Sequence, residues 1–128
     1  GNGDVNTPEK ALEYKTRYNV DGIMIGRASI GYPWIFNEIK HFVNTGEHLA
    51  KPTVIDRVDA AIQHLEMSVQ WKGEILGVAE MKRHYTNYFK GIRDFKKTRM
   101  KLVTSFELEV IRETLNEIKT NADQYEFV

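Results

Sequence analysis

The sequence predicts a mainly α-helical protein, with a short α/β segment at its amino-terminal end and a helical bundle after it. Apolar residues recur at spacings of three and four from residue 53 onward, which is typical of helices with one buried face. A single apolar run, at residues 20–26, is typical of a buried strand. With 128 residues, 41% of them hydrophobic, the chain can bury one ordinary core.

The first 31 residues are predicted to form a loop, a helix and a strand. In TPEKALEYKTRY, Thr7 can cap the helix, Pro8 suits its first position, and Glu9 faces the positive end of the helix dipole. The short strand VDGIMIG follows directly and closes on glycine. A helix that leads into a buried strand is an α/β unit, so GNGDV is interpreted as the loop after an earlier strand.

Residues 32–50 are predicted to form a bridging helix and a linker. Pro33 stands near the start of this helix and Gly46 just past its end. From residue 51 to residue 128 no strand signal recurs, so this region is predicted to be a small antiparallel helical domain.

Its first helix is predicted to start at Thr53, which can form a capping box with Asp56, and to stop at Gly73. Two shorter helices are expected at about 76–90 and 95–103. The apolar stripe of the first helix consists of Ile55, Val58, Ile62, Leu65 and Val69.

Thr104 with Glu107 is predicted to cap the last helix. The apolar stripe of that helix consists of Leu108, Ile111, Leu115 and Ile118. The final eight residues, NADQYEFV, are predicted to be frayed.

The formal net charge is zero, but the charges are segregated along the chain. Between residues 82 and 101 there are eight cations and one acid, Asp94, whereas from Glu107 onward there are six acids and two bases. Such a positive block favours contact with nucleic acid phosphates over the alternative, a solvated basic face without a partner. The eight cations, called the basic block below, are Lys82, Arg83, Lys90, Arg93, Lys96, Lys97, Arg99 and Lys101.

Aromatic residues interleave with these cations, and two roles are open for them. Tyr85, Tyr88, Phe89 and Phe95 could stack on unpaired bases, but burial in the core is the preferred interpretation. The two tryptophans, Trp34 and Trp71, are predicted to be core anchors.

The glycine-containing stretches GNGD and IGRASIG suggest a site for a phosphate group. Glycine lets the backbone amides approach a ligand closely, and Arg27 beside Gly26 can neutralise phosphate charge. Gly26 follows the predicted strand, at the end where α/β folds bind ligands. Ordinary glycine turns are the alternative interpretation of both loops.

Other classes of site receive no support. The chain has no cysteine, which excludes disulfides and thiolate chemistry within it, and its four histidines show no metal-ligand spacing, so no metal is expected. There is no long apolar run and no signal segment, so no membrane contact and a cytoplasmic location are expected.

The order of these motifs resembles a known family. GNGDV, a helix and then DGIMIGRASIGYPWIF resemble the end of the catalytic domain of the tRNA-dihydrouridine synthases, and RHYTNYFKGI with FKKTRMKLVTS resembles their carboxyl-terminal helical domain. The resemblance implies that residues 1–31 are the last βα portion of a (β/α)8 TIM barrel that binds FMN. It also implies that residues 51–128 form a helical tRNA-binding domain.

The resemblance further implies which residues act. Asn2, Gly3 and Asp4, with Gly26 and Arg27, would hold the FMN phosphate, and the basic block would supply contacts to tRNA. The family reduces uridine with FMN and NAD(P)H and uses a cysteine as proton donor. This sequence has no cysteine, so these 128 residues are expected to be inactive alone and to retain FMN poorly. The barrel strand at residues 21–25 is expected to be poorly ordered, to refold locally or to pair with a second copy.

Two alternatives remain open at this point. The chain could be a stand-alone helical RNA-binding module in which GNGD is incidental. It could also be the tail of another FMN-dependent TIM-barrel oxidoreductase that acts on a small molecule.

Overall fold

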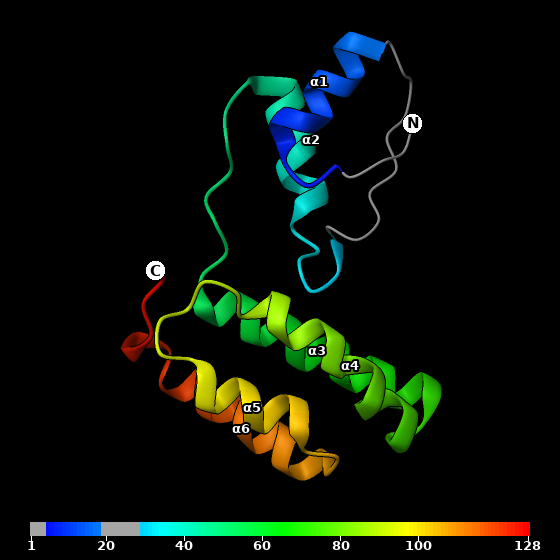
Figure 1. Cartoon of the computed structure of the whole chain (residues 1–128), viewed down its shortest axis with the longest axis vertical. Helices are drawn as coiled ribbons and strands as arrows, with labels where there is room; N and C mark the ends of the chain where they lie inside the picture. Colours follow the sequence, from blue (N-terminus) through cyan, green and yellow to red (C-terminus); the bar gives the residue numbers. More distant parts are fainter. Residues whose placement is uncertain (1–4, 19–28) are drawn as a thin grey trace. The chain divides into compact units, whose positions relative to one another are not determined.

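The computed structural model describes residues 5–18 and 29–128, which form two compact units (Figure 1). The first unit ends at Lys51 and the second begins at Pro52. The predicted strand at residues 20–26, and with it the expectation of pairing through residues 21–25, lies outside the described residues. No helix in the described ranges is long and apolar enough to cross a membrane.

The first unit is built on two helices, α1 (Pro8–Tyr18) and α2 (Ile35–Thr45), which pack against each other. The predicted cap of α1 is confirmed, since the Lys10 amide donates to Thr7 Oγ1 at 3.1 Å. Gly46 ends α2 as predicted: it adopts a left-handed conformation, with φ at 74°, and its amide donates to the Phe42 carbonyl at 2.7 Å.

The second unit is a bundle of four helices, α3 (Val54–Lys72), α4 (Glu74–Tyr88), α5 (Lys96–Thr104) and α6 (Leu108–Thr120). Helix α3 packs on α4 and α6, and α5 also packs on α4 and α6, so the four helices surround a shared core. Figure 1 shows α3 beside α4 and α5 beside α6. The prediction of a mainly α-helical protein is confirmed for the described residues.

Helix α3 begins and ends where the sequence predicts, but its buried face is shifted. Thr53 and Asp56 form the predicted capping box, with distances of 3.1 and 3.0 Å, and Gly73 ends the helix. Ile55, predicted in the apolar stripe, is instead 44% exposed, and Val54 is buried in its place. Val54, Val58, Ala61 and Leu65 lie within about 60° of one another around α3 and form its buried face, whereas Ile55 lies about 100° from Val54 and outside that face.

The predicted start of α6 is wrong, although its buried stripe is confirmed. Thr104 is the last residue of α5, and its hydroxyl donates to the Met100 carbonyl at 2.6 Å. Helix α6 begins at Leu108, after a turn in which the Glu107 amide donates to Ser105 Oγ at 3.2 Å. The stripe Leu108, Ile111, Leu115 and Ile118 is buried as predicted.

The last residues are ordered rather than frayed. A 3₁₀ turn at Ala122–Gln124 follows α6, and Phe127 then forms an antiparallel bridge with Ile92. The Arg93 amide donates to the Glu126 carbonyl at 2.8 Å, and the Val128 amide donates to the Gly91 carbonyl at 2.7 Å. These two hydrogen bonds hold the tail against the loop between α4 and α5.

Neither tryptophan is a fully buried core anchor. Trp71 is 83% exposed, which contradicts the prediction, because it lies about 200° around α3 from Val69 and therefore points away from the core. Trp34 is half-buried, with its ring edge-on to Tyr32 at 5.4 Å between centroids.

Candidate nucleic-acid interface

The basic block lies on α4, on α5 and on the loop at residues 89–95 that joins them. This loop uses two left-handed backbone conformations, at Gly91 and at Asp94, and its apolar residues Phe89, Ile92 and Phe95 are buried. With the apolar side chains inside, the charged side chains of the same segment lie on the surface.

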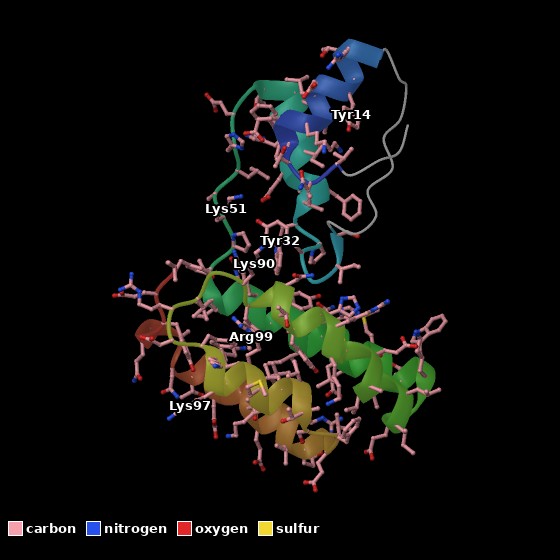
Figure 2. The ribbon with its side chains drawn as sticks, viewed as in Figure 1. Tyr14, Tyr32, Lys51, Lys90, Lys97 and Arg99 are labelled. Atoms are coloured by element: carbon pink, nitrogen blue, oxygen red, sulfur yellow. The ribbon has the colours of Figure 1, made fainter. Side chains whose placement is uncertain are left out.

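Five cations of the block are exposed and form neither an ion pair nor a side-chain hydrogen bond in the part of the chain that the structure describes. Lys97 points outward from α5 in Figure 2, where Lys90 is also labelled. Since no carboxylate neutralises these side chains, all their donors are available to a ligand. The five are Lys90, Arg93, Lys96, Lys97 and Lys101.

The start of α5 is unusual in its electrostatics. The residue before the helix, Phe95, provides no side-chain cap, and the first turn contains no acid but two lysines, Lys96 and Lys97. Cations at the positive end of a helix dipole destabilise the helix, typically by a few tenths of a kcal/mol to about 1 kcal/mol. The same arrangement raises the positive potential on this surface, which favours an anionic partner.

Lys82 has a different position from the other cations. Its Nζ donates to the carbonyls of Val103 at 2.9 Å and Ser105 at 2.5 Å, and it lies 4.0 Å from the centroid of the Phe106 ring. Burial lowers the pKa of this ammonium group. Lys82 therefore caps the carboxyl end of α5, and two of its three N–H donors are already occupied.

The remaining two cations lie at the edge of this surface. Arg99 is half-buried, and its buried Nε atom has no hydrogen-bond partner among the described residues. Arg83 is exposed, with its Nε 3.4 Å from His84 Nε2.

The aromatic residues of the block are in the core, which confirms the preferred interpretation. Tyr85, Tyr88, Phe89 and Phe95 are all buried, so none is available to stack on a base. The exposed aromatic residue next to the block is Phe106, which the sequence analysis did not single out. Its only signal in the sequence was its place in the break between two helices.

Two histidines form a contact between α3 and α4. The rings of His64 and His84 lie edge-to-face with centroids 4.5 Å apart, and His64 Nδ1 is 3.0 Å from the Tyr88 hydroxyl. Burial, followed by the charges of His64 and Arg83, lowers the pKa of His84 to about 4, so this ring is neutral at physiological pH. Within residues 5–18 and 29–128, no group of three or more metal-ligating side chains is found.

The cations of α6, unlike those of the basic block, are neutralised. Arg112 forms a fork of two hydrogen bonds to Glu66, both at 2.8 Å, and also contacts Glu109. Lys119 pairs with Asp59 at 2.8 Å. The cationic surface without acidic partners is thus confined, within this unit, to α4, α5 and their loop.

The residues predicted to hold the FMN phosphate are Asn2, Gly3, Asp4, Gly26 and Arg27, and all five lie outside the described residues. What the structure describes next to them is the buried Val5 and the capped start of α1.

Comparison with known proteins identifies relatives for both units. The chain is 41% identical to tRNA-dihydrouridine synthase B of Pseudomonas putida over 83 aligned residues. The aligned region covers 65% of this chain and 25% of that protein. For the protein of the same name from Pseudomonas aeruginosa, the identity is 38% over 98 residues, covering 74% and 30% of the two chains. For that of Shewanella oneidensis it is 33% over 127 residues, covering 99% and 35%.

The chain thus spans about a quarter to a third of the length of the curated relatives it matches. A family model described as "Dihydrouridine synthase (Dus)" matches residues 1–123, which include α1 and α2 as well as the helical bundle. The chain belongs to the dihydrouridine synthase family.

Proposed function

We propose that this chain is part of a flavin-dependent tRNA-dihydrouridine synthase, an enzyme that reduces uridine to dihydrouridine in tRNA with FMN and NAD(P)H. Family membership supports the reaction, and the names of three relatives, each a tRNA-dihydrouridine synthase B, support tRNA as the substrate. Within this enzyme, residues 51–128 form the tRNA-binding domain.

The observation that supports RNA binding most directly is the group of five exposed cations without acidic partners. A nucleic acid backbone presents regularly spaced negative charges, and each cation that neutralises a phosphate releases bound counterions. The proposed phosphate contacts come from these five, with Arg83 and Arg99 at the edge of the interface. Lys82 is assigned to capping α5, because two carbonyl oxygens already accept its hydrogen bonds.

For the cofactor, the proposed phosphate site consists of Asn2, Gly3, Asp4, Gly26 and Arg27. The glycine amides, the Asn2 amide and the Arg27 guanidinium are donors that suit a phosphate monoester, and Asp4 could contribute only its backbone amide, because its carboxylate repels the phosphate. FMN would supply the hydride for uridine reduction. Because the sequence contains no cysteine, the proton donor implied by the family resemblance, we propose that these 128 residues bind RNA without reducing it.

The test is binding of the chain to tRNA by fluorescence anisotropy, with duplex DNA for comparison. The chain is expected to prefer tRNA, and its affinity is expected to fall steeply between about 50 and 200 mM salt. Lys97→Gln should lower the slope of log affinity against log salt by about 0.7 to 0.9, the value for one lost phosphate contact.

Lys119→Gln is the matched control, since it removes the same charge from the α6 surface, where Lys119 pairs with Asp59. It is expected to leave the slope unchanged. Absence of tRNA binding at low salt, or equal slopes for the two variants, would contradict the proposed interface.

A further inference from the structure

We propose that Phe106 is a stacking platform for an unpaired nucleotide of the bound RNA, and that Lys82 holds its ring in place. This inference rests on the proposed function, because it assigns a base contact within the same interface. It is carried by the exposure of the Phe106 ring and by the position of the Lys82 ammonium group against it.

Phe106 is 72% exposed in the short connection between α5 and α6. A phenylalanine that packs in the hydrophobic core is buried, as Phe89 and Phe95 are in the same unit. The Phe106 ring instead stands in solvent just past the end of α5, the helix that carries Lys97 and Lys101.

Lys82 makes one contact to this ring and is itself held by two hydrogen bonds to the backbone. The ammonium group donates to the carbonyls of Val103 and Ser105, at 2.9 and 2.5 Å, and lies 4.0 Å from the ring centroid of Phe106. One face of the ring is therefore occupied by a cation that is itself hydrogen-bonded to the backbone on either side of Thr104. With one face held and the ring still 72% exposed, the opposite face is open to a planar partner.

Phe106 lies where the basic block ends, five residues after Lys101 and directly before the exposed Glu107, and a nucleotide is the partner that would use both the ring and the preceding cations. A nucleotide has a planar π-face for the ring and a phosphate for the neighbouring cations, and base–aromatic stacking tolerates any base. Lys101 is exposed without an acidic partner in the described chain and is available to the phosphate, whereas the Lys82 ammonium group contacts the ring and the backbone carbonyls. A ring held before binding also loses less conformational freedom when the nucleotide stacks.

Trp71 offers an internal comparison. It is 83% exposed, but the neighbouring cation, Lys72, pairs with Glu80, and no cation–π contact to Trp71 is found among the described residues. Trp71 is thus an aromatic residue of similar exposure without the charge that an RNA contact requires, which makes it the matched control.

The experiment measures binding of the full chain to tRNA, and to a fully paired RNA duplex, by fluorescence anisotropy at several salt concentrations. Phe106→Leu is expected to weaken tRNA binding about 10-fold or more, in line with the loss of one stacked base. The salt dependence should stay unchanged, since no phosphate contact is lost, and duplex binding should not change. Phe106→Trp should retain affinity for tRNA, and Trp71→Leu should behave as the unmodified chain.

Three outcomes would overturn the stacking role. The first is wild-type tRNA affinity in Phe106→Leu while Lys97→Gln still lowers the salt slope, a result that leaves the proposed function standing. The second is an equal loss of affinity in Trp71→Leu, which indicates general apolar contacts such as those with a protein partner. The third is a lower salt slope in Phe106→Leu, which indicates that the ring only orders nearby cations.

Failure of the unmodified chain to bind tRNA contradicts the proposed function itself.

Discussion

Gly77 lies so close to the backbone of Val69 that a Cβ atom at position 77 would stand 2.7 Å from the Val69 Cα atom. The Ser68 hydroxyl donates to the Gly77 carbonyl at 3.1 Å at the same point. This close approach joins α3 to α4 and so fixes the helix from which Lys82 and Arg83 project.

The first prediction is that Gly77→Ala destabilises the bundle. The added methyl group would meet backbone atoms, which cannot rotate away, and overpacking of this kind costs about 1 to 3 kcal/mol or more. The better helix propensity of alanine offsets up to about 1 kcal/mol of this cost. We expect a net loss of about 2 kcal/mol in the free energy of unfolding, measured by urea titration with circular dichroism.

Gly73→Ala is the comparison for this measurement. No atom lies within 4 Å of a Cβ atom at position 73, but φ is 85° and ψ is 169°, a conformation adopted almost only by glycine, so the cost is backbone strain alone, about 1 to 3 kcal/mol. A Gly77→Ala protein as stable as the unmodified chain would contradict the close approach of the two helices.

The second prediction concerns Arg57, a buried cation that joins three parts of the second unit. Its Nε donates to the Pro52 carbonyl at 3.2 Å, its Nη1 donates to the Tyr88 carbonyl at 3.3 Å, and its guanidinium lies 4.7 Å from the centroid of the Phe127 ring. Arg57→Met should lower the free energy of unfolding by about 2 to 3 kcal/mol, because two buried carbonyl groups lose their donors.

Arg112→Met provides the contrast. Arg112 forms ion pairs with Glu66 and Glu109, but all three side chains are well solvated, at 35%, 46% and 74% exposure. Exposed ion pairs contribute about 0 to 1 kcal/mol. If the Arg112 variant loses as much stability as the Arg57 variant, burial is not what makes Arg57 important.

The third prediction is a loss of stability in mild acid that depends on His84. The folded protein lowers the pKa of His84 from 6.5 to about 4, so between these values the unfolded chain binds a proton that the folded chain does not. Stability therefore falls as the pH decreases from 6.5 to 4. Because the ring is partly solvated, we expect a change on the order of 1 kcal/mol.

Urea unfolding at several pH values between 4.5 and 7 measures this dependence. His64, whose pKa is also lowered by burial, contributes in the same direction. His84→Gln should flatten the dependence in part while leaving that of His64. An unchanged pH profile in this variant would contradict the assignment to His84.

The features that sequence predicted well are those decided within one or two helical turns. The capping box of Thr53 and Asp56, the stop at Gly73 and the stripe of α6 each depend on residues three or four positions apart. Such signals are local, because the capping hydrogen bonds and the spacing of apolar residues act within one or two turns of the same helix.

The features that sequence missed depend on contacts between distant residues. The tail is ordered because Phe127 pairs with Ile92, and Lys82 is withdrawn from the surface by carbonyls 21 and 23 residues away. The charge pattern assigned all eight cations the same role, as contacts to RNA. The packing of α4 against α5 gives Lys82 a different role, because it brings this side chain to the carbonyls at the end of α5 and leaves Lys97 exposed.

This separation gives the last prediction, in which two lysines of the basic block respond oppositely to the same change. Lys82→Met removes the donor to the Val103 and Ser105 carbonyls, so it should lower the free energy of unfolding by about 1.5 to 3 kcal/mol. It should weaken tRNA binding through Phe106 without altering the salt slope. Lys97→Met should lower the salt slope and leave stability within about 0.5 kcal/mol, since its side chain is exposed. Urea titration measures the stability of the two variants, and fluorescence anisotropy measures the salt slope of their tRNA binding. A lower salt slope in Lys82→Met would contradict the prediction and indicate that Lys82 contacts a phosphate.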